Sequence, residues 1–362
     1  MRVIESARFV KFTKEIQHIE DIITEGRDFA LYRLPLQSVC HIIGEASCTE
    51  EFLSFSALSD VNGFWVSPFV TDGKAKALFI HGEERCFELP DVTASTSIRF
   101  KLTDDKPSYF ADFDKFSSLL REGQVEKVVL ARKAFVQMTY SASDIFHLFL
   151  KACQLYPRNF VALWRTAVSG TWLVATPELL LKQESDTFQT MALAGTRSIY
   201  EQDMLDLSGW DDKNRYEQQM VADYISSILN DKANIIEKDG PYPSQSGELL
   251  HLRTDFVFQT DLSIGEIVQS LHPTPAVCGF PKLDAYDKIV SLESIDRAYY
   301  AGFCGPINMN GNSSLYVTLR CMKFVQGGAY AYAGGGLLKE SNPSEEWTET
   351  CRKIETLLKI LE

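Results

Sequence analysis

The sequence predicts an α+β fold, in which strands joined by tight turns alternate with inserted helices. Strand-like segments at 159–166, 171–176, 178–183 and 187–193 are separated by short turns, several of them Ser-Gly or Ser-Asp. Connections this short indicate antiparallel neighbours, because parallel strands need a long crossover. Hairpins of this kind with helices between them are typical of α+β proteins.

The first part of the chain, residues 1–104, is less regular than the rest. A helix is expected near 10–24, followed by short strands such as Phe29–Leu34 and Ala77–His81. The polar, turn-rich stretch Thr103–Pro107 indicates a boundary between two parts of the same compact unit. We therefore expect a variable N-terminal part at 1–104 and a catalytic region at 105–362, both within one compact unit.

From residue 105 onward the hydrophobic pattern is sharper and its elements follow in a clear order. Asn342 and Pro343 mark the start of the last helix, because asparagine caps helices and proline suits the first helical position. The elements expected are a helix at 108–122, a strand at 125–138, helices at 142–155 and 211–231, a strand pair at 315–325 and 329–336 that turns at Gly327-Gly328, and a helix at 343–361.

Composition excludes several classes of protein. The 362 residues are 45% hydrophobic and 23% charged, as in globular proteins with a real core, and the net charge of -13 argues against nucleic acid as a partner. No signal peptide and no run of about 18 apolar residues is found, so no membrane span is expected. The eight cysteines form no C-x-x-C pair, which favours reduced thiols in a cytoplasmic protein.

Two residues could exchange protons. Lys127 shares one face of its strand with Val125 and Val129, and a lysine buried among apolar residues would have the lowered pKa of a general base. Alternation alone favours the other interpretation, an edge lysine that extends into water. Glu178 precedes three leucines, so it is either a buried general acid with a raised pKa or a turn residue in solvent.

Carboxylates on two helices could bind a metal ion. Glu217 lies four residues before Val221, on the apolar stripe of its helix, unless the first turn extends beyond the core. Glu346, Glu349 and Lys353 share one face of the last helix, which taken alone is more typical of a salt-bridged surface. If the carboxylates do bind an ion, oxygen ligands without cysteine or histidine favour Mg²⁺.

Groups that could hold an anion lie just before the last helix. Gly334–Gly336 leave backbone N–H groups open, and Arg320 could grip a carboxylate with two parallel hydrogen bonds. His251 and His272 are expected to be structural, and no arrangement of nucleophile and base suggests covalent catalysis. The residues together indicate a metal-assisted acid–base enzyme that acts on an anionic small molecule.

Residues 105–362 resemble the chorismate-utilising enzymes, which include isochorismate, salicylate, anthranilate and aminodeoxychorismate synthases. The matching segments occur in the family's order: KVVLAR, TPELLL, ALAGTR, KNRYEQQ, LLHL, LHPTPAVCGFPK, VTLRC, YAGGG and EEWTETCRK. The resemblance implies large antiparallel sheets packed as a β-sandwich surrounded by helices, as in anthranilate synthase component I. It also implies that the anionic substrate is chorismate.

The resemblance also implies a role for each matching residue. Lys127 stands at the position of the water-activating base, and Glu178 at that of the acid that protonates the departing C4 hydroxyl. Glu217 and Glu349 match the magnesium ligands, with Glu346 nearby. Groups that match the substrate pocket are Gly195, Thr196, His251, Ala276, Arg320, Gly334, Gly335 and Lys353.

Within the family, the residues favour an isochorismate synthase, an isomerase that uses water. Ammonia-using members usually carry glutamine where Lys127 stands, and Ala194 occupies the place of the covalent lysine of some aminodeoxychorismate synthases. Salicylate synthase and an ammonia-using synthase remain alternatives. We expect a monomer without a glutaminase subunit, which supplies isochorismate to menaquinone or siderophore biosynthesis.

Two positions depart from the family pattern. Asn214 replaces a frequent acidic residue, and Gln218 replaces a frequent histidine beside the first metal ligand. Such changes could weaken metal affinity through lost hydrogen bonds. They are the one argument for a further alternative, a chorismate-binding protein without turnover.

Overall fold

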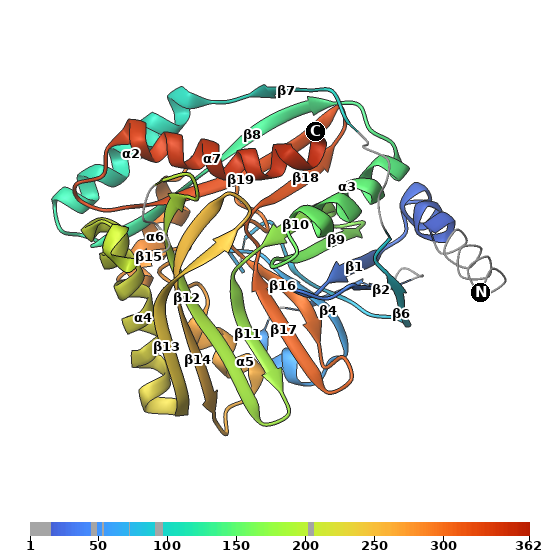
Figure 1. Ribbon diagram of the computed structural model, residues 1–362, viewed down its shortest axis with the longest axis horizontal. Coiled ribbons are helices and arrows are strands. Elements are labelled where there is room, and N and C mark those ends of the chain that lie inside the picture. The colour runs from blue at the N-terminus through green and yellow to red at the C-terminus, as the bar shows by residue number, and fades with distance from the viewer. Residues whose placement is uncertain (1–15, 45–48, 53, 72, 91–96, 202–205) are drawn as a thin grey trace.

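Two large antiparallel sheets form the centre of the molecule (Figure 1). The computed structural model describes residues 16–362 except 45–48, 53, 72, 91–96 and 202–205. The strands of the first sheet are, in spatial order, β15 (Gly279–Phe280), β8 (Lys127–Met138), β19 (Gly328–Leu337), β18 (Cys321–Val325), β10 (Gly170–Thr176), β9 (Phe160–Thr166), β1 (Phe29–Arg33), β2 (Val39–Ile43) and β6 (Glu84–Glu88), with β7 (Phe100–Thr103) also paired to β8.

The second sheet contains the long hairpins of the chain's middle part together with strands from both ends. Its strands are, in spatial order, β13 (Asn234–Ser246), β14 (Leu249–Gln259), β12 (Thr187–Ser198), β11 (Leu179–Glu184), β17 (Asn312–Val317), β16 (Phe303–Ile307), β4 (Gly63–Ser67), β5 (Ala77–Ile80) and β3 (Thr49–Phe52).

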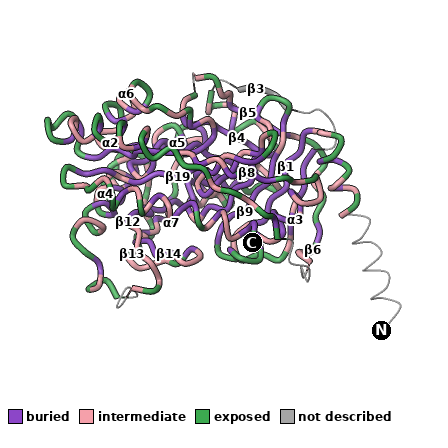
Figure 2. Tube along the Cα trace, turned by 90° about the horizontal axis from the view of Figure 1, so that it is seen from above, coloured by how far each residue is buried: buried purple, intermediate pink, exposed green. Residues whose placement is uncertain are grey.

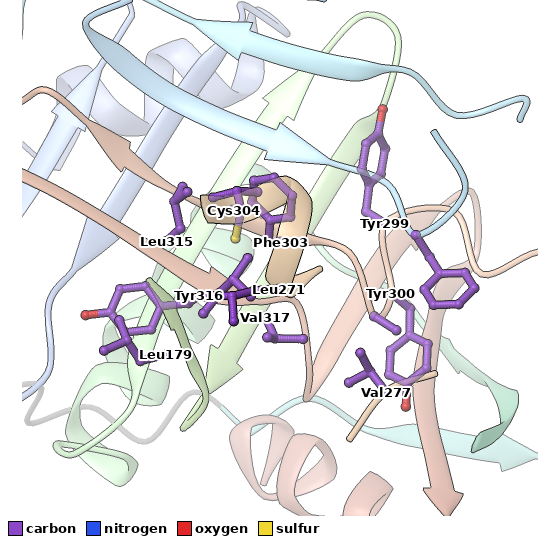
Figure 3. Close-up of a cluster of buried hydrophobic side chains, with 14 of the residues drawn as sticks. Leu179, Leu271, Val277, Tyr299, Tyr300, Phe303, Cys304, Leu315, Tyr316 and Val317 are labelled. Atoms are coloured by element: carbon purple, nitrogen blue, oxygen red, sulfur yellow. The ribbon is translucent and has the colours of Figure 1, made fainter. Parts of the chain in front are cut away.

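The facing sides of the two sheets share one hydrophobic core. Phe160 of β9 stacks on Tyr316 of β17 with ring centroids 4.2 Å apart, which joins the sheets directly. Figure 3 shows part of this core, with Phe303, Leu315 and Tyr316 from the second sheet. Each large side chain buried here stabilises the fold by roughly 1.5–3 kcal/mol. Figure 2 shows that buried segments run through the middle of the molecule and exposed ones along its periphery.

Helices cover the outer surfaces of the sheets. A second core cluster joins Phe146 and Phe149 of α3 with Leu357 of α7 and Leu163 of the first sheet, and α4 packs against β12 of the second sheet. The helices are α2 (Lys106–Arg121), α3 (Ala142–Leu155), α4 (Asp212–Lys232), α5 (Ile264–Leu271), α6 (Lys282–Leu292) and α7 (Pro343–Leu361), with short 3-10 turns η1 (Phe55–Ser59) and η2 (Leu207–Gly209).

The helix boundaries follow from capping residues in the sequence. The side chain of Asn342 accepts hydrogen bonds from the N–H groups of Ser344 and Glu345, at 2.9 and 3.3 Å. At the start of α3, Ser141 and Asp144 form a capping box. No described helix combines the length and apolar composition needed to cross a bilayer.

The predicted strand at 315–325 is wrong, because the chain changes sheets within it. Residues up to Val317 belong to β17 of the second sheet, whereas Cys321 begins β18 of the first. Arg320 lies between them with φ at 47°, a left-handed conformation that ends an extended strand. The predicted hairpin is confirmed, but its two-residue turn is Gln326-Gly327, one residue earlier than predicted, since Val325 pairs with Gly328 between β18 and β19.

Strands from the first hundred residues enter both sheets. β1, β2 and β6 extend the first sheet beyond β9, and β3, β4 and β5 extend the second beyond β16. Of the helix predicted near 10–24, residues 16–24 are helical and the remainder lies outside the described residues. The domain boundary at 104 stays a prediction, although strands from both of its sides share the same hydrogen-bonded sheets.

Candidate active site

A cavity of about 600 Å³, including its open mouth, brings together side chains from distant parts of the sequence. It lies where β8 and β19 of the first sheet meet the ends of β11 and β12 and the helices α4 and α7. The predicted site residues that line it are Lys127, Glu178, Gly195, Thr196, Glu217, His251, Ala276, Arg320, Gly334, Gly335, Glu349 and Lys353.

Lys127 is buried in this cavity, with 1% of its surface exposed. The interpretation of an edge lysine that extends into water is wrong, because β15 pairs with β8 there and closes the edge, with Phe280 opposite Lys127. Burial lowers the pKa of the ammonium, although the carboxylate of Glu217, 3.9 Å away, opposes the shift. A lowered pKa is the property that a lysine needs to act as a general base.

Glu178 is buried at the junction between β10 and β11, with 3% of its surface exposed. Its backbone is held in place on both sides, since its N–H donates to Thr176 Oγ1 at 3.3 Å and its carbonyl accepts from Val317 at 3.0 Å. Burial raises the pKa of its carboxyl to about 8, despite the nearby ammonium of Lys127. The interpretation of a solvated turn glutamate is therefore wrong, and the group retains a proton at neutral pH.

Glu217 projects from the buried side of α4, as its place on the apolar stripe predicts. It is 8% exposed, and Val221, one turn later, is fully buried. Burial raises the pKa of Glu217, and the neighbouring carboxylate of Glu349 adds to that shift. A buried carboxylate beside another one requires a cation to stay ionised.

The face of α7 that carries Glu346, Glu349 and Lys353 points into the protein, so the interpretation of a salt-bridged surface helix is wrong for this face. Glu346 and Lys353 are 1% and 9% exposed, and a quarter of the Glu349 side chain is exposed. Lys353 Nζ lies 2.6 Å from Glu349 Oε1 and donates to the carbonyl of Gly334 at 2.9 Å. Burial alone would raise the pKa of Glu349, but Lys353 outweighs it and the pKa is lowered.

Several features of this carboxylate group fit a hard divalent cation. Glu346 Oε1 accepts from Lys213 at 2.6 Å and from Ser341 at 2.7 Å, whereas Glu346 Oε2 is buried without a hydrogen-bond partner among the described residues. Burial and the charge of Glu349 raise the pKa of Glu346. An unpartnered buried oxygen close to further carboxylates is the donor set that Mg²⁺ prefers.

The glycines of β19 leave the space into which these side chains project. A β-carbon at Gly335 would lie 3.2 Å from Glu346 Oε2 and 3.9 Å from Glu349 Oε1. At the next position, Gly336, it would lie 2.7 Å from Lys127 Cε and 3.5 Å from Glu217 Oε1. The glycine run therefore brings the carboxylates of both helices close to one stretch of backbone.

The other side of the cavity is suited to an anion. His251 Nδ1 donates to the carbonyl of Gly195 at 2.8 Å, and Nε2 accepts from Arg320 Nη2 at 3.4 Å. Burial, with the charge of Arg320, lowers the pKa of His251 to about 3 and keeps it neutral. Arg320 is 8% exposed and projects its guanidinium into the cavity from the break between β17 and β18.

The two departures from the family pattern are satisfied by local hydrogen bonds. Asn214 Oδ1 accepts from the N–H of Thr196 at 2.9 Å, and its amide donates to Asp211 at 2.8 Å. Gln218 donates to Thr254 Oγ1 at 2.7 Å in the protein interior. Both side chains therefore hold together segments that surround the cavity. Neither substitution changes a residue that lines the cavity.

Two residues near the site were missed by the sequence analysis. Lys213 pairs with Glu346, and its place four residues before Glu217 on α4 is a signal that could have found it. Tyr300 lines the cavity, and its hydroxyl lies 2.7 Å from where a β-carbon at Gly334 would stand. Tyr300 comes from an irregular segment before β16, where periodicity carries no information.

Comparison with known proteins points to one family. The model of the family described as chorismate binding enzyme matches residues 83–362. The curated isochorismate synthase EntC of Escherichia coli strain K12 is 30% identical over 252 residues, which are 67% of this chain and 64% of that protein. The chain thus aligns with less than two thirds of that relative's length.

Solved structures confirm the predicted fold. The menaquinone-specific isochorismate synthase MenF of Escherichia coli superposes with a TM-score of 0.78 at 19% identity, over 96% of this chain and 91% of that one. Anthranilate synthase component I of Streptococcus pneumoniae gives a TM-score of 0.66 at 16% identity, over 91% and 90% of the two chains. The predicted anthranilate synthase-like sandwich is therefore correct.

Proposed function

The chain belongs to the family of chorismate binding enzymes, and from that membership we propose that it is a magnesium-dependent isochorismate synthase. The reaction adds water at C2 of chorismate and expels the C4 hydroxyl. One observation carries the proposal: Lys127 and Glu178 line the same cavity, and burial favours the neutral form of each. It lowers the pKa of Lys127 and raises the pKa of Glu178. A neutral amine and a protonated carboxyl are the base and acid that this reaction needs.

The proposed roles of Lys127 and Glu178 account for both proton transfers. The neutral Lys127 amine takes a proton from a water molecule whose oxygen bonds to C2. The ring double bond shifts, the bond between C4 and its hydroxyl breaks, and Glu178 donates its proton so that water leaves. Lys127 then carries one proton more and Glu178 one fewer, and exchange with solvent restores both groups. The product is isochorismate, with no net gain or loss of atoms.

Magnesium would be held by Glu217 and Glu349, with Glu346 beside them. When bound, the ion would supply a fixed positive charge that neutralises a substrate carboxylate and orients the ring. The unpartnered Oε2 of Glu346 and the raised pKa values of Glu217 and Glu346 support this assignment. A nearby cation would allow all the carboxylates to be ionised together.

The remaining polar groups would position the substrate's carboxylates. Arg320 and Lys353 present cationic donors to the cavity, and the backbone at Gly334 and Gly335 can approach a ligand closely. With Lys127 and Glu178 both neutral, the site carboxylates Glu217, Glu346 and Glu349 are matched by the cations Lys213, Arg320 and Lys353. A dicarboxylate that enters together with Mg²⁺ would keep this charge balance, which favours their joint binding.

Water is favoured over ammonia as the nucleophile by the residues in the cavity. A buried amine at Lys127 serves to activate water, whereas ammonia is already nucleophilic and needs no such base. Ala194 lines the cavity where a covalent lysine would otherwise stand. We propose accordingly a cytoplasmic monomer that works without a glutaminase subunit and supplies menaquinone or siderophore biosynthesis.

Product identification tests this proposal. Purified protein is incubated with chorismate and Mg²⁺, with and without ammonium, and the products are separated by liquid chromatography and mass spectrometry. We expect isochorismate in both cases, unchanged by ammonium. Salicylate with pyruvate would assign a salicylate synthase, and an ammonium-dependent amino product would assign an ammonia-using enzyme. Tight binding of chorismate without any product would assign a non-catalytic protein.

A further inference from the structure

Far from the central cavity, three kinds of metal-ligating side chain meet on the edge of the first sheet. Tyr32, His41 and Cys86 lie opposite one another on β1, β2 and β6, because the register pairs Tyr32 with His41 and His41 with Cys86. Glu84 precedes Cys86 by two residues, so its side chain is on the same face of the strand. The backbone pairing itself therefore gathers an imidazole, a thiol and a carboxylate.

The distances among these groups suit one small ion. His41 Nδ1 lies 2.9 Å from Glu84 Oε1 and 3.3 Å from Cys86 Sγ, and the three ligand atoms all lie within 4.8 Å of one another. Tetrahedral zinc, with bonds of about 2.0–2.1 Å to nitrogen and oxygen and about 2.3 Å to sulfur, separates its ligand atoms by roughly 3.3–3.6 Å. Only small rotations of the side chains are needed to reach that geometry.

Tyr32 holds two of these side chains in place. Its ring stacks on the His41 imidazole, with centroids 4.9 Å apart and planes inclined by 6°. Its hydroxyl donates to Glu84 Oε1 at 2.7 Å. Such supporting contacts fix the orientation of ligand side chains and are typical of metal sites. A simple pair of His41 with Glu84 would not need Cys86, yet the thiol of Cys86 also lies against His41 Nδ1.

We propose that His41, Glu84 and Cys86 bind one zinc ion, at a site distinct from the central carboxylates. The mixture of nitrogen, sulfur and oxygen ligands selects zinc over magnesium, which prefers oxygen alone. Cys86 is exposed, so water can occupy the fourth position. Strands β18, β10, β9 and β1 separate this site from β19 and the central cavity. The ion would clamp the edge strand β6 to β2.

Cobalt titration tests this proposal directly, since Co²⁺ replaces zinc and gives an absorption band when a thiolate binds it. The full chain is titrated with Co²⁺ in excess Mg²⁺, which occupies sites made of oxygen ligands. We expect a thiolate-to-cobalt band that saturates at one equivalent and is bleached by zinc. Cys86→Ser should abolish the band, and His41→Ala should weaken binding about tenfold or more, whereas Glu88→Gln on the same strand should change neither.

Thermal unfolding gives a second readout that does not depend on turnover. Zinc should raise the melting temperature of the wild type and of Glu88→Gln, because a ligand that binds only the folded state stabilises it. It should not raise that of Cys86→Ser. Absence of a saturable band, or an equal band in Cys86→Ser, would overturn the proposal. Neither result bears on the isochorismate synthase assignment, which is tested by product analysis.

Discussion

At the scale of single residues, the proposed reaction depends on two buried groups whose charged forms are disfavoured by the same surroundings. Lys127 and Glu178 have 1% and 3% of their surfaces exposed, so neither is stabilised by water in its ionised form. Local sequence could not establish this. The alternation of side chains placed Lys127 on an apolar face of its strand. The edge of that strand is closed only by the pairing of β15 with β8, which joins Phe280 to Lys127 across the sequence.

Replacing Lys127 tests its proposed role as the base. Lys127→Ala should lower kcat by about 10²–10⁴-fold, the usual contribution of a general base. The protein should still fold, which its circular dichroism spectrum and a cooperative melting curve check. Lys133→Ala, on the same strand but partly exposed, is the matched control. Wild-type turnover in Lys127→Ala would remove this residue from the mechanism.

The raised pKa of Glu178 predicts how activity depends on pH. Its carboxyl, with a pKa of about 8, is protonated at neutral pH and loses its proton above that value. The rate should therefore fall about tenfold per pH unit well above pH 8. Glu178→Gln cannot donate a proton and should be inactive at every pH, whereas Glu184→Gln, at the exposed end of β11, should follow the wild type. An unchanged rate at pH 10 would assign the acid elsewhere.

The same shift has a consequence for stability. The folded protein holds the Glu178 proton more tightly than the unfolded chain, whose glutamates titrate near 4.5. The contribution of this group to the free energy of unfolding should therefore fall as pH rises from about 4.5 to 8, by up to roughly 3–5 kcal/mol. Urea unfolding of Glu178→Gln should lack this component. An identical pH dependence in wild type and variant would contradict the raised pKa.

At the scale of elements, the break between β17 and β18 places Arg320 in the cavity. The segment VTLRCM has the pattern of one continuous strand, and the change of sheet at residues 318–320 depends on packing that no local pattern reports. Helices were easier to predict: α3 and α7 begin and end at the expected residues, because capping residues mark them.

Arg320→Lys tests whether the strand break serves substrate binding. Lysine keeps the charge but lacks the planar fork that grips a carboxylate, so KM should rise about 10–100-fold with a smaller change in kcat. Folding should be preserved, since the left-handed backbone at φ 47° is no more strained for lysine than for arginine. Lys323→Ala, within β18, should leave KM unchanged. Equal KM values in Arg320→Lys and the wild type would exclude a substrate contact.

The glycine run of β19 is the second element that shapes the site. A β-carbon at Gly336 would stand 2.7 Å from Lys127 Cε, so Gly336→Ala should displace the lysine side chain. We expect kcat to fall by about 10²-fold or more while the melting temperature drops by only a few degrees. Circular dichroism and steady-state kinetics measure both. Normal kcat in this variant would show that the position of Lys127 tolerates displacement.

At the scale of the whole molecule, the site is assembled by two sheets and two helices. Its residues lie between positions 127 and 353 of the sequence. Turn spacing predicted antiparallel strands, resemblance to the family predicted that they pack as a sandwich, and both predictions were confirmed. The division of β1–β6 between the two sheets was not predicted, because the pairing of strands that are distant in sequence produces no local sequence pattern. The charged residues that line the cavity were found through motifs, whereas the roles of Lys213 and Tyr300 emerged from the folded structure.

The metal assignment is also tested on the whole protein. EDTA should abolish turnover, and added Mg²⁺ should restore it. Glu217→Gln and Glu349→Gln should each raise the Mg²⁺ concentration needed for half-maximal activity by about tenfold or more, because each removes a charged oxygen ligand. Glu345→Gln, exposed on α7, is the control. Full activity in EDTA would refute the assignment.

The most direct test of the account is the origin of the new hydroxyl oxygen. Chorismate and Mg²⁺ are incubated with the protein in water enriched in ¹⁸O, and the product is analysed by mass spectrometry. If Lys127 delivers water to C2 while Glu178 releases the C4 hydroxyl, isochorismate must carry one heavy oxygen at C2. Isochorismate without the label would mean that the original hydroxyl migrates within the molecule, and it would contradict the account.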